Sequence, residues 1–167
     1  AAYLKAAKPR SKVLILDAND DVVSKGALFK RIWADRYPGM IEYRANFKTV
    51  DVDAGARTAI SELGDRVQAD VLNLVPPQRA GTIATQSGLA SANKRWCEVD
   101  FLSFESTQAK NIHVLGDAIM VAPMMPKSAH MANQHAKVCA AAVVDMLAGR
   151  ALNPAPVLTN TCYSYVS

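Results

Sequence analysis

The sequence predicts an α/β fold in which helices pack against a parallel sheet. Three segments carry this prediction. Residues 12–16 are predicted to form a short strand with four consecutive apolar residues, and residues 112–115, with three apolar residues of four, also have the pattern of a buried strand. Strands that are apolar on both faces are typical of parallel sheets covered by helices. Residues 129–147 carry small or apolar side chains at spacings of three and four, which indicates a helix with one buried face.

Composition excludes several classes of protein. Half of the 167 residues are apolar and 20% are charged, as in ordinary globular domains. The net charge of +4 is spread along the chain, and the densest basic clusters, at residues 8–12 and 94–95, lack interleaved aromatic residues. We therefore expect no nucleic-acid binding. No apolar run approaches the roughly 18 residues that cross a bilayer, so we also expect no transmembrane segment.

The first elements resemble part of a βαβ unit. Residues 1–7 indicate the end of a helix, and the strand at residues 12–16 is followed by Asp17. An acidic residue at this place binds a ribose hydroxyl in dinucleotide-binding folds, but the Gly-rich turn that precedes it there is missing from this sequence. Ser24 is the expected N-cap of the next helix, and Pro38-Gly39 is its expected end.

Extended segments follow in the middle of the chain. They are expected at residues 41–47, 50–60 and 69–75. The first two alternate or carry turn signals, which favours an antiparallel meander, whereas the third is nearly all apolar. A short helix is expected at residues 80–87, with Gly88 past its end. Residues 93–105 follow no clear pattern.

A Gly-Asp pair ends the apolar run at residues 112–115. Gly116 lets the backbone pass close to a neighbouring group. Asp117 is expected at the carboxyl end of a strand, where open α/β sheets bind ligands, and its carboxylate can accept hydrogen bonds from sugar-like hydroxyls. An Asp turn or a cap for a following helix explains the same residue as well.

The helix at residues 129–147 buries a face made mostly of alanine, which allows a sheet or a flat cofactor to approach closely. Lys127 and Ser128 lead its first turn, where unpaired N–H groups and the helix dipole favour an anionic partner. Tight packing of the helix on a sheet explains the alanines equally well. Gly149 and Arg150 fit a C-terminal cap.

The three cysteines are Cys97, Cys139 and Cys162, and no C-x-x-C spacing occurs among them. An odd number at these spacings predicts neither a zinc site nor a complete set of disulfides. Cys139 lies on the alanine face and is expected in the core. The sequence assigns no role to Cys97.

Four motifs together resemble one flavoprotein family. Residues 107–117 are similar to the second FAD-binding motif of the flavoprotein disulfide reductases, with a Thr ten residues before an Asp that follows an apolar strand and Gly. The segments "NLVPPQRAG" (73–81), "PKSAHMANQHAKV" (126–138) and "LTNTCYS" (158–164) resemble the flavoprotein subunit of flavocytochrome c sulfide dehydrogenase. The resemblance extends from Lys12 to the end of the chain.

This resemblance implies a Rossmann-like FAD/NAD(P)-binding fold, three-layered, with a parallel sheet plus an antiparallel meander, and incomplete here. Residues 1–75 would form a pyridine-nucleotide-like domain that lacks its first strand. Residues 76–150 would be a return segment of the FAD-binding domain, and residues 151–167 the start of the C-terminal interface domain. The first FAD domain and most of the third domain would lie outside this sequence, so we expect a fragment that is inactive alone.

The resemblance also implies the chemistry. It is the FAD-dependent oxidation of hydrogen sulfide through a redox-active cysteine disulfide, with electrons passing to a cytochrome c subunit that carries haem c, in the periplasm. Cys162 matches one of the two redox cysteines, and its partner would lie in the missing N-terminal part. Asp117 would bind the ribityl chain of FAD beside Gly116. The helix start at Lys127 and Ser128 would face the reduced flavin, and Asp17 would be a turn residue that keeps no nucleotide role.

Two other functions stay open. The related sulfide:quinone reductases share the sulfide and flavin chemistry but pass electrons to a quinone. A nucleotide-binding or interaction module without redox chemistry is the second alternative.

Overall fold

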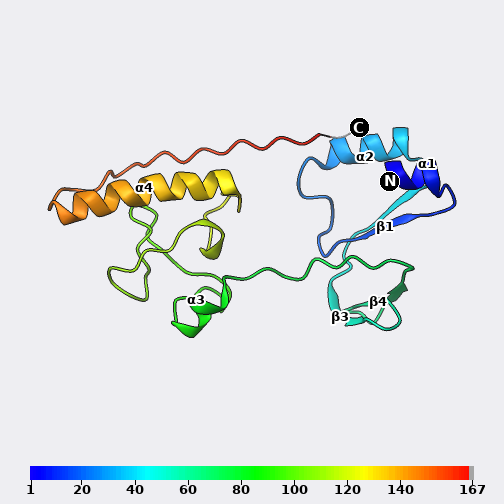
Figure 1. Cartoon of the computed structure of the whole chain (residues 1–167), viewed down its shortest axis with the longest axis horizontal. Coiled ribbons are helices and arrows are strands. Elements are labelled where there is room, and N and C mark those ends of the chain that lie inside the picture. Colours follow the sequence, from blue (N-terminus) through cyan, green and yellow to red (C-terminus); the bar gives the residue numbers. More distant parts are fainter. Residues whose placement is uncertain (166–167) are drawn as a thin grey trace. The chain divides into compact units, whose positions relative to one another are not determined.

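The computed structural model describes residues 1–165 and divides into two compact units, which are formed mainly by Ala1–Val75 and by Pro76–Tyr163 (Figure 1). The last two residues of the segment predicted to begin a third domain, 166 and 167, lie outside the described residues.

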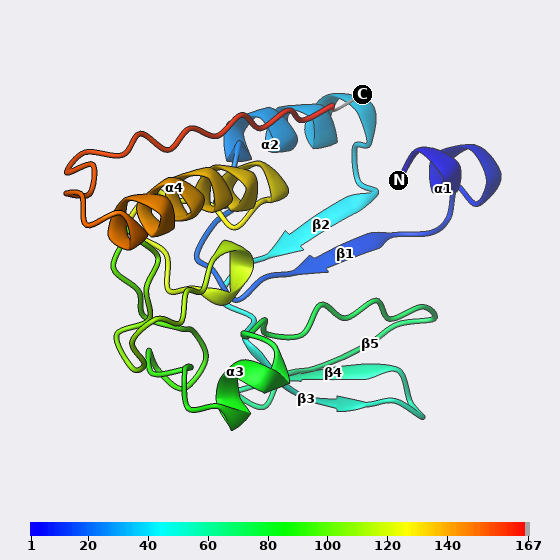
Figure 2. The ribbon, with the colours of Figure 1, turned by 60° about the vertical axis from the view of Figure 1, so that its left-hand side comes forward.

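A parallel pair of strands forms the centre of the first unit. Strand β1 (Val13–Leu16) pairs with β2 (Ile41–Arg44), and Figure 2 shows the two strands side by side. Helix α2 (Gly26–Arg36) connects them, and its Trp33 packs against Tyr43 with ring centres 6.2 Å apart. A helical crossover between neighbouring strands requires them to run parallel. The parallel strand predicted near residues 12–16 is confirmed.

Two predictions for this unit are wrong in detail. Residues 41–44 join the parallel pair and not the antiparallel meander, because the chain returns to the sheet through α2 and so enters in the same direction as β1. Ser24 is not the N-cap of α2. Lys25 takes that position with a left-handed backbone (φ 55°), and no side chain caps the first turn. Helix α1 (Ala2–Ala7) lies where the sequence predicts it.

An antiparallel meander completes the first unit. It consists of β3 (Thr49–Asp53), β4 (Thr58–Ser61) and β5 (Arg66–Gln68), paired in that order. The predicted turn near residues 54–55 joins β3 to β4. The central strand β4 is the most buried of the three, as expected for a strand with a neighbour on each side.

The strand predicted at residues 69–75 is absent. Val71 and Val75 are 83% and 78% exposed, and the described residues form no strand here. Only Ala69, at the start of the segment, continues the sheet pairing, through a hydrogen bond from its N–H to the carbonyl of Arg57 at 3.1 Å. An apolar run becomes a strand only when another strand satisfies its backbone hydrogen-bonding groups. The apolar composition of this segment therefore predicted a strand that has no partner strand.

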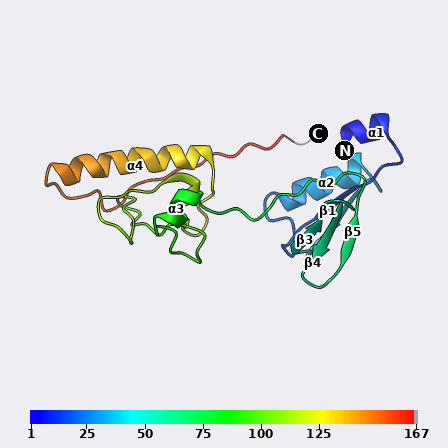
Figure 3. The same cartoon turned by 60° about the horizontal axis from the view of Figure 1, so that its bottom comes forward.

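The second unit contains two short helical elements, one long helix and extended loops. They are α3 (Thr82–Gln86), the 3-10 turn η1 (Gly116–Ala118) and the long helix α4 (Ala129–Leu147). Figure 3 shows α3 and α4. Two apolar clusters support them. The first is built around Ala80, Ala84 and Cys97, and the second around Phe104, Ile119 and Cys139.

Helix α4 matches its predicted bounds and ends at a glycine cap. Gly149 has a left-handed backbone (φ 66°), its N–H donates to the carbonyl of Met146, and the N–H of Arg150 donates to the carbonyl of Asp145. This pair of bonds is a Schellman motif. The predicted cap at Gly149 and Arg150 is confirmed.

The predicted strand at residues 112–115 is not a regular strand. Within residues 1–165 it forms one isolated antiparallel bridge, between His113 and Glu105, and Ile112 is 44% exposed. Among the described residues no neighbouring strand runs alongside it, so its apolar side chains are only partly covered.

No helix in the described part of the chain combines the length and apolar character needed to cross a bilayer.

Candidate functional site

The η1 turn packs directly on α4. Gly116 is buried and has a left-handed backbone (φ 72°), and a Cβ atom added to it would lie 3.4 Å from Cβ of Ala132. A larger residue at position 116 would be strained both by this backbone conformation and by the close approach. The alanine face of α4 therefore allows the turn to lie against the helix, which agrees with the tight-packing interpretation of these alanines.

A histidine holds the same turn from the helix side. The N–H of Gly116 donates to Nδ1 of His135 at 3.1 Å, and His135 is only 1% exposed. Its ring lies against Phe104 with ring centres 4.6 Å apart. Burial lowers the pKa of His135, because the charged imidazolium is poorly solvated there. His135 was not predicted from the sequence, although a polar residue on the apolar face of α4 was a detectable signal.

A lysine holds the turn from the other side. Nζ of Lys127 donates to the carbonyl oxygens of Asp117 at 2.7 Å and Ile119 at 2.6 Å. The same ammonium lies 3.7 Å from the centre of the Trp96 ring. Burial lowers the pKa of Lys127, and the charge of Asp117 opposes this shift. Lys127 thus has partners within the protein, and its predicted contact with a cofactor stays a prediction.

Trp96 reaches Lys127 because the backbone beside it pairs with the η1 region. The N–H of Cys97 donates to the carbonyl of Ala118 at 3.0 Å, and the N–H of Met120 donates to the carbonyl of Cys97 at 2.8 Å. A parallel bridge between Cys97 and Ile119 results. This pairing falls within residues 93–105, for which the sequence predicted no structure.

A cavity of about 370 Å³ lies beside the turn. It is lined by Gln78, Arg79, Ala80, Gly81, Trp96, Asp117, Ala118 and Lys127. Asp117 is exposed, and its carboxylate accepts no hydrogen bond from any described residue. Arg79 likewise forms no hydrogen bond or ion pair within residues 1–165. The cavity therefore presents both an available acceptor and an available cationic donor to a ligand.

Asp17 provides a direct contrast with Asp117. One oxygen of Asp17 accepts hydrogen bonds from the backbone and side-chain nitrogens of Asn19, at 3.0 and 2.7 Å. The other oxygen accepts a hydrogen bond from the hydroxyl of Tyr43 at 2.8 Å. The backbone bond from Asn19 contributes most to the lowered pKa of Asp17. Both oxygens are engaged internally, which agrees with the interpretation of Asp17 as a turn residue.

The start of α4 is tied to the segment that carries Cys162. The Ser128 hydroxyl accepts a hydrogen bond from the N–H of Met131 at 3.0 Å and donates one to the side-chain oxygen of Asn160 at 2.7 Å. The N–H of Thr161 donates to Nδ1 of His130 at 3.2 Å. Ser128 is thus an N-cap, and the exposed Cys162 follows a segment that is anchored at this helix start. Asn160 and His130 were not predicted from the sequence.

The other two cysteines are buried. Cys97 is 0% exposed and Cys139 is 7% exposed, each within an apolar cluster. Burial raises the pKa of both thiols, and at Cys97 the charge of Lys127 partly opposes this. Both therefore have the character of inert core thiols, and the prediction of a core position for Cys139 is confirmed.

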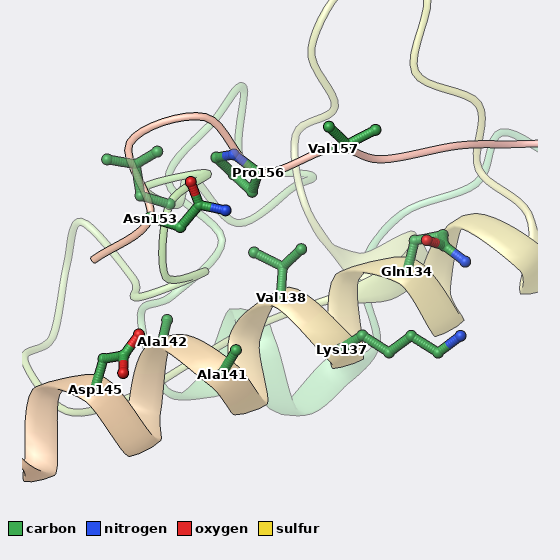
Figure 4. Close-up of a pocket in the computed structure, with 10 residues that line it drawn as sticks. Gln134, Lys137, Val138, Ala141, Ala142, Asp145, Asn153, Pro156 and Val157 are labelled. Atoms are coloured by element: carbon green, nitrogen blue, oxygen red, sulfur yellow. The ribbon is translucent and has the colours of Figure 1, made fainter. Parts of the chain in front are cut away.

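A second cavity, of about 240 Å³, lies between α4 and the chain that follows it (Figure 4). Its walls are mostly aliphatic, from Val138, Ala141, Ala142, Pro156 and Val157. Neither Asp117 nor Cys162 lines it. We therefore regard the cavity beside Asp117 as the candidate site.

One comparison with known proteins concerns the first unit. The family described as sulfide dehydrogenase [flavocytochrome c] flavoprotein chain, central, matches residues 1–76. The resemblance stated from the sequence is thereby confirmed.

Solved structures extend the similarity over both units. The sulfide:quinone oxidoreductase of Aquifex aeolicus is 16% identical with a TM-score of 0.66, and the match covers 89% of this chain and 39% of that one. A chain of the mitochondrial ATP synthase of Tetrahymena thermophila is 25% identical with a TM-score of 0.65, over 92% of this chain and 37% of that one.

A third structure shows the same fold. The reduced CoADR-RHD of Bacillus anthracis is 18% identical with a TM-score of 0.55, and the match covers 85% of this chain and 26% of that one. This chain thus spans between about a quarter and two fifths of the three chains. The mixed α/β fold with parallel and antiparallel sheets, predicted for the flavoprotein family, is confirmed.

Proposed function

We propose that this chain is part of an FAD-dependent, sulfide-oxidising flavoprotein, and that the cavity beside Asp117 receives part of FAD. The observation that carries the proposal is the state of the Asp117 carboxylate. It lines a cavity and accepts no hydrogen bond within the described residues, whereas the carboxylate of Asp17 is fully engaged. A carboxylate in this state is suited to accept hydrogen bonds from the ribityl hydroxyls of FAD.

The residues around the cavity fit this ligand. Arg79 and Gln78 offer donors to the oxygens of the ligand, and Trp96 offers an aromatic wall. At Gly81 an added Cβ would meet nothing within 4 Å, so the backbone leaves open space on that side. FAD, when bound, supplies the electron-accepting chemistry that amino-acid side chains lack.

The other predicted cofactor residues would act on the site in different ways. Gly116 lets the turn approach α4, and Lys127 fixes the carbonyl groups on either side of Ala118. Ser128 caps α4 and leaves the positive end of the helix dipole beside Lys127. We assign to these three residues the shaping of the site and to Asp117 the direct hydrogen bond.

Cys162 is the proposed catalytic residue. Hydrosulfide attacks one sulfur of a disulfide that includes Cys162, which forms a new S–S bond and releases the other cysteine as a thiolate. The exposure of Cys162 supports this role, since the attacking anion must reach the sulfur. Cys97 and Cys139 are unsuitable as its partner because both are buried.

The proposed electron acceptor is a cytochrome c subunit with haem c, in the periplasm. The match of residues 1–76 to the flavocytochrome c family supports this choice. The structural similarity to a sulfide:quinone oxidoreductase supports a quinone as the alternative acceptor. A module that binds a nucleotide without redox chemistry is the remaining alternative.

One set of measurements on the complete flavoprotein separates these three functions. We expect a flavin absorbance spectrum that bleaches when sulfide is added, followed by reduction of added cytochrome c. Reduction of a soluble quinone analogue in place of cytochrome c would favour the quinone enzyme. Absence of flavin, or a flavin that sulfide does not bleach, would contradict sulfide oxidation and favour the module.

A further inference from the structure

The hydrogen bond between Gly116 and His135 defines the protonation of a buried imidazole. The Gly116 N–H is the donor, at 3.1 Å, so Nδ1 of His135 must present a lone pair. The neutral ring then carries its proton on Nε2. His113, in the same unit, is the opposite case, because its Nδ1 lies 2.9 Å from the carbonyl oxygen of Ser103 and must donate.

The burial of His135 has a cost that packing alone does not explain. Nε2 is fully buried and has no hydrogen-bond partner within residues 1–165. An unsatisfied buried donor destabilises a fold, and an apolar side chain of similar size would avoid it. The structure shows one contact that offsets this loss of stability, because Nδ1 accepts the hydrogen bond from the Gly116 N–H. The Phe104 ring packs against the imidazole and fixes its plane.

We propose that His135 is a positioning residue for Asp117, acting through the peptide N–H of Gly116 in the Nε2–H tautomer. The left-handed backbone at Gly116 determines the direction in which Asp117 leaves the turn. The hydrogen bond that the Gly116 N–H donates to this rigid, buried ring holds that peptide in one orientation. His135 thus acts on the ligand of Asp117 without contacting it, and this role rests on the proposed binding of FAD at Asp117.

Substitutions at His135 test the role through FAD affinity in the complete flavoprotein. His135→Phe keeps the ring packing but removes the acceptor, and we expect the FAD dissociation constant to rise roughly five- to tenfold. His135→Asn can place its amide oxygen near the position of Nδ1, and we expect it to stay within about threefold of wild type. His113→Phe is the matched control, since it removes another histidine hydrogen bond to the backbone of the same unit, and we expect no change.

Combining His135→Phe with Asp117→Ala separates this inference from the proposed function. If His135 acts through Asp117, His135→Phe causes no further loss of FAD affinity once Asp117 is alanine. Additive losses would overturn the positioning role and leave Asp117 as a ligand residue. An unchanged affinity in Asp117→Ala alone would instead overturn the proposed contact of Asp117 with FAD.

Nuclear magnetic resonance of the wild-type protein tests the inference without any substitution. Nitrogen shifts of labelled histidines distinguish the two neutral tautomers. We expect the Nε2–H form at His135 and a protonated Nδ1 at His113. A protonated Nδ1 at His135 would overturn the assignment, because the Gly116 N–H would then have no acceptor.

Discussion

The ammonium group of Lys127 lies 3.7 Å from the centre of the Trp96 ring and donates to the carbonyl oxygens of Asp117 and Ile119. One side chain therefore connects three separate stretches of the second unit. A lysine ammonium has three donors, and this arrangement directs two at carbonyls and the charge at an aromatic face. The shape of the η1 turn depends on this contact as well as on His135.

Replacing Lys127 with methionine tests this connection. Lys127→Met keeps much of the apolar chain but removes both charge-assisted hydrogen bonds, so we expect a loss of about 1.5–3 kcal/mol in the free energy of unfolding. Urea unfolding of the chain measures the change. Lys110→Met is the control, because Lys110 is exposed and has no partner within the described residues, and it should stay within about 0.5 kcal/mol of wild type. Equal stability of the two variants would contradict the structural role of Lys127.

The pair Tyr43 and Asp17 predicts an unusual tyrosine titration. Burial and the hydrogen bond to Asp17 raise the pKa of Tyr43 to about 12. Because the folded pKa is above the ordinary value of 10, the contribution of neutral Tyr43 to stability is present below pH 10 and is lost as the pH rises through about 12. Tyrosinate absorbance should show one of the five tyrosines ionising late.

Asp17→Asn supplies the control for this titration. It removes the negative charge that opposes ionisation of Tyr43, so the pKa of Tyr43 should move back toward 10. If all five tyrosines of the folded wild-type chain ionise together near pH 10, the hydrogen bond between Tyr43 and Asp17 is not formed in solution.

Cys162→Ser distinguishes an enzyme from a binding module. In the complete flavoprotein we expect this change to abolish sulfide-dependent reduction of cytochrome c while FAD stays bound, since serine cannot form the disulfide that sulfide attacks. Cys139→Ala is the matched control, because it alters a buried thiol outside the candidate site and should retain turnover. Undiminished sulfide turnover in Cys162→Ser would contradict the catalytic role of Cys162 and favour a structural one.

The sequence predicted the elements whose signals are local. Helix α4 has its expected bounds because its alanine face, the cap at Ser128 and the glycine at position 149 all lie within the helix or next to it. Residues 69–75 and 112–115 were wrongly predicted as strands for the opposite reason. A strand requires a partner elsewhere in the chain, and an apolar run does not say whether that partner exists.

The candidate site was likewise predictable only in part. Gly116 and Asp117 follow from a short motif, and the structure places Asp117 at a cavity and Gly116 against α4. His135 holds Gly116 across 19 residues of sequence, and Trp96 acts at the turn only through its contact with Lys127. No periodicity links residues so far apart, although His135 interrupts an otherwise apolar helix face.

Comparing FAD affinity in Asp117→Ala and Asp17→Ala of the complete flavoprotein tests the central claim most directly. Both changes remove one carboxylate, but only that of Asp117 lines the cavity and accepts no hydrogen bond from a described residue. Loss of a charge-assisted hydrogen bond of about 1.5–3 kcal/mol predicts a dissociation constant about ten- to 150-fold higher for Asp117→Ala, with no change for Asp17→Ala. Wild-type FAD affinity in Asp117→Ala, or an equal loss in both variants, would contradict the account.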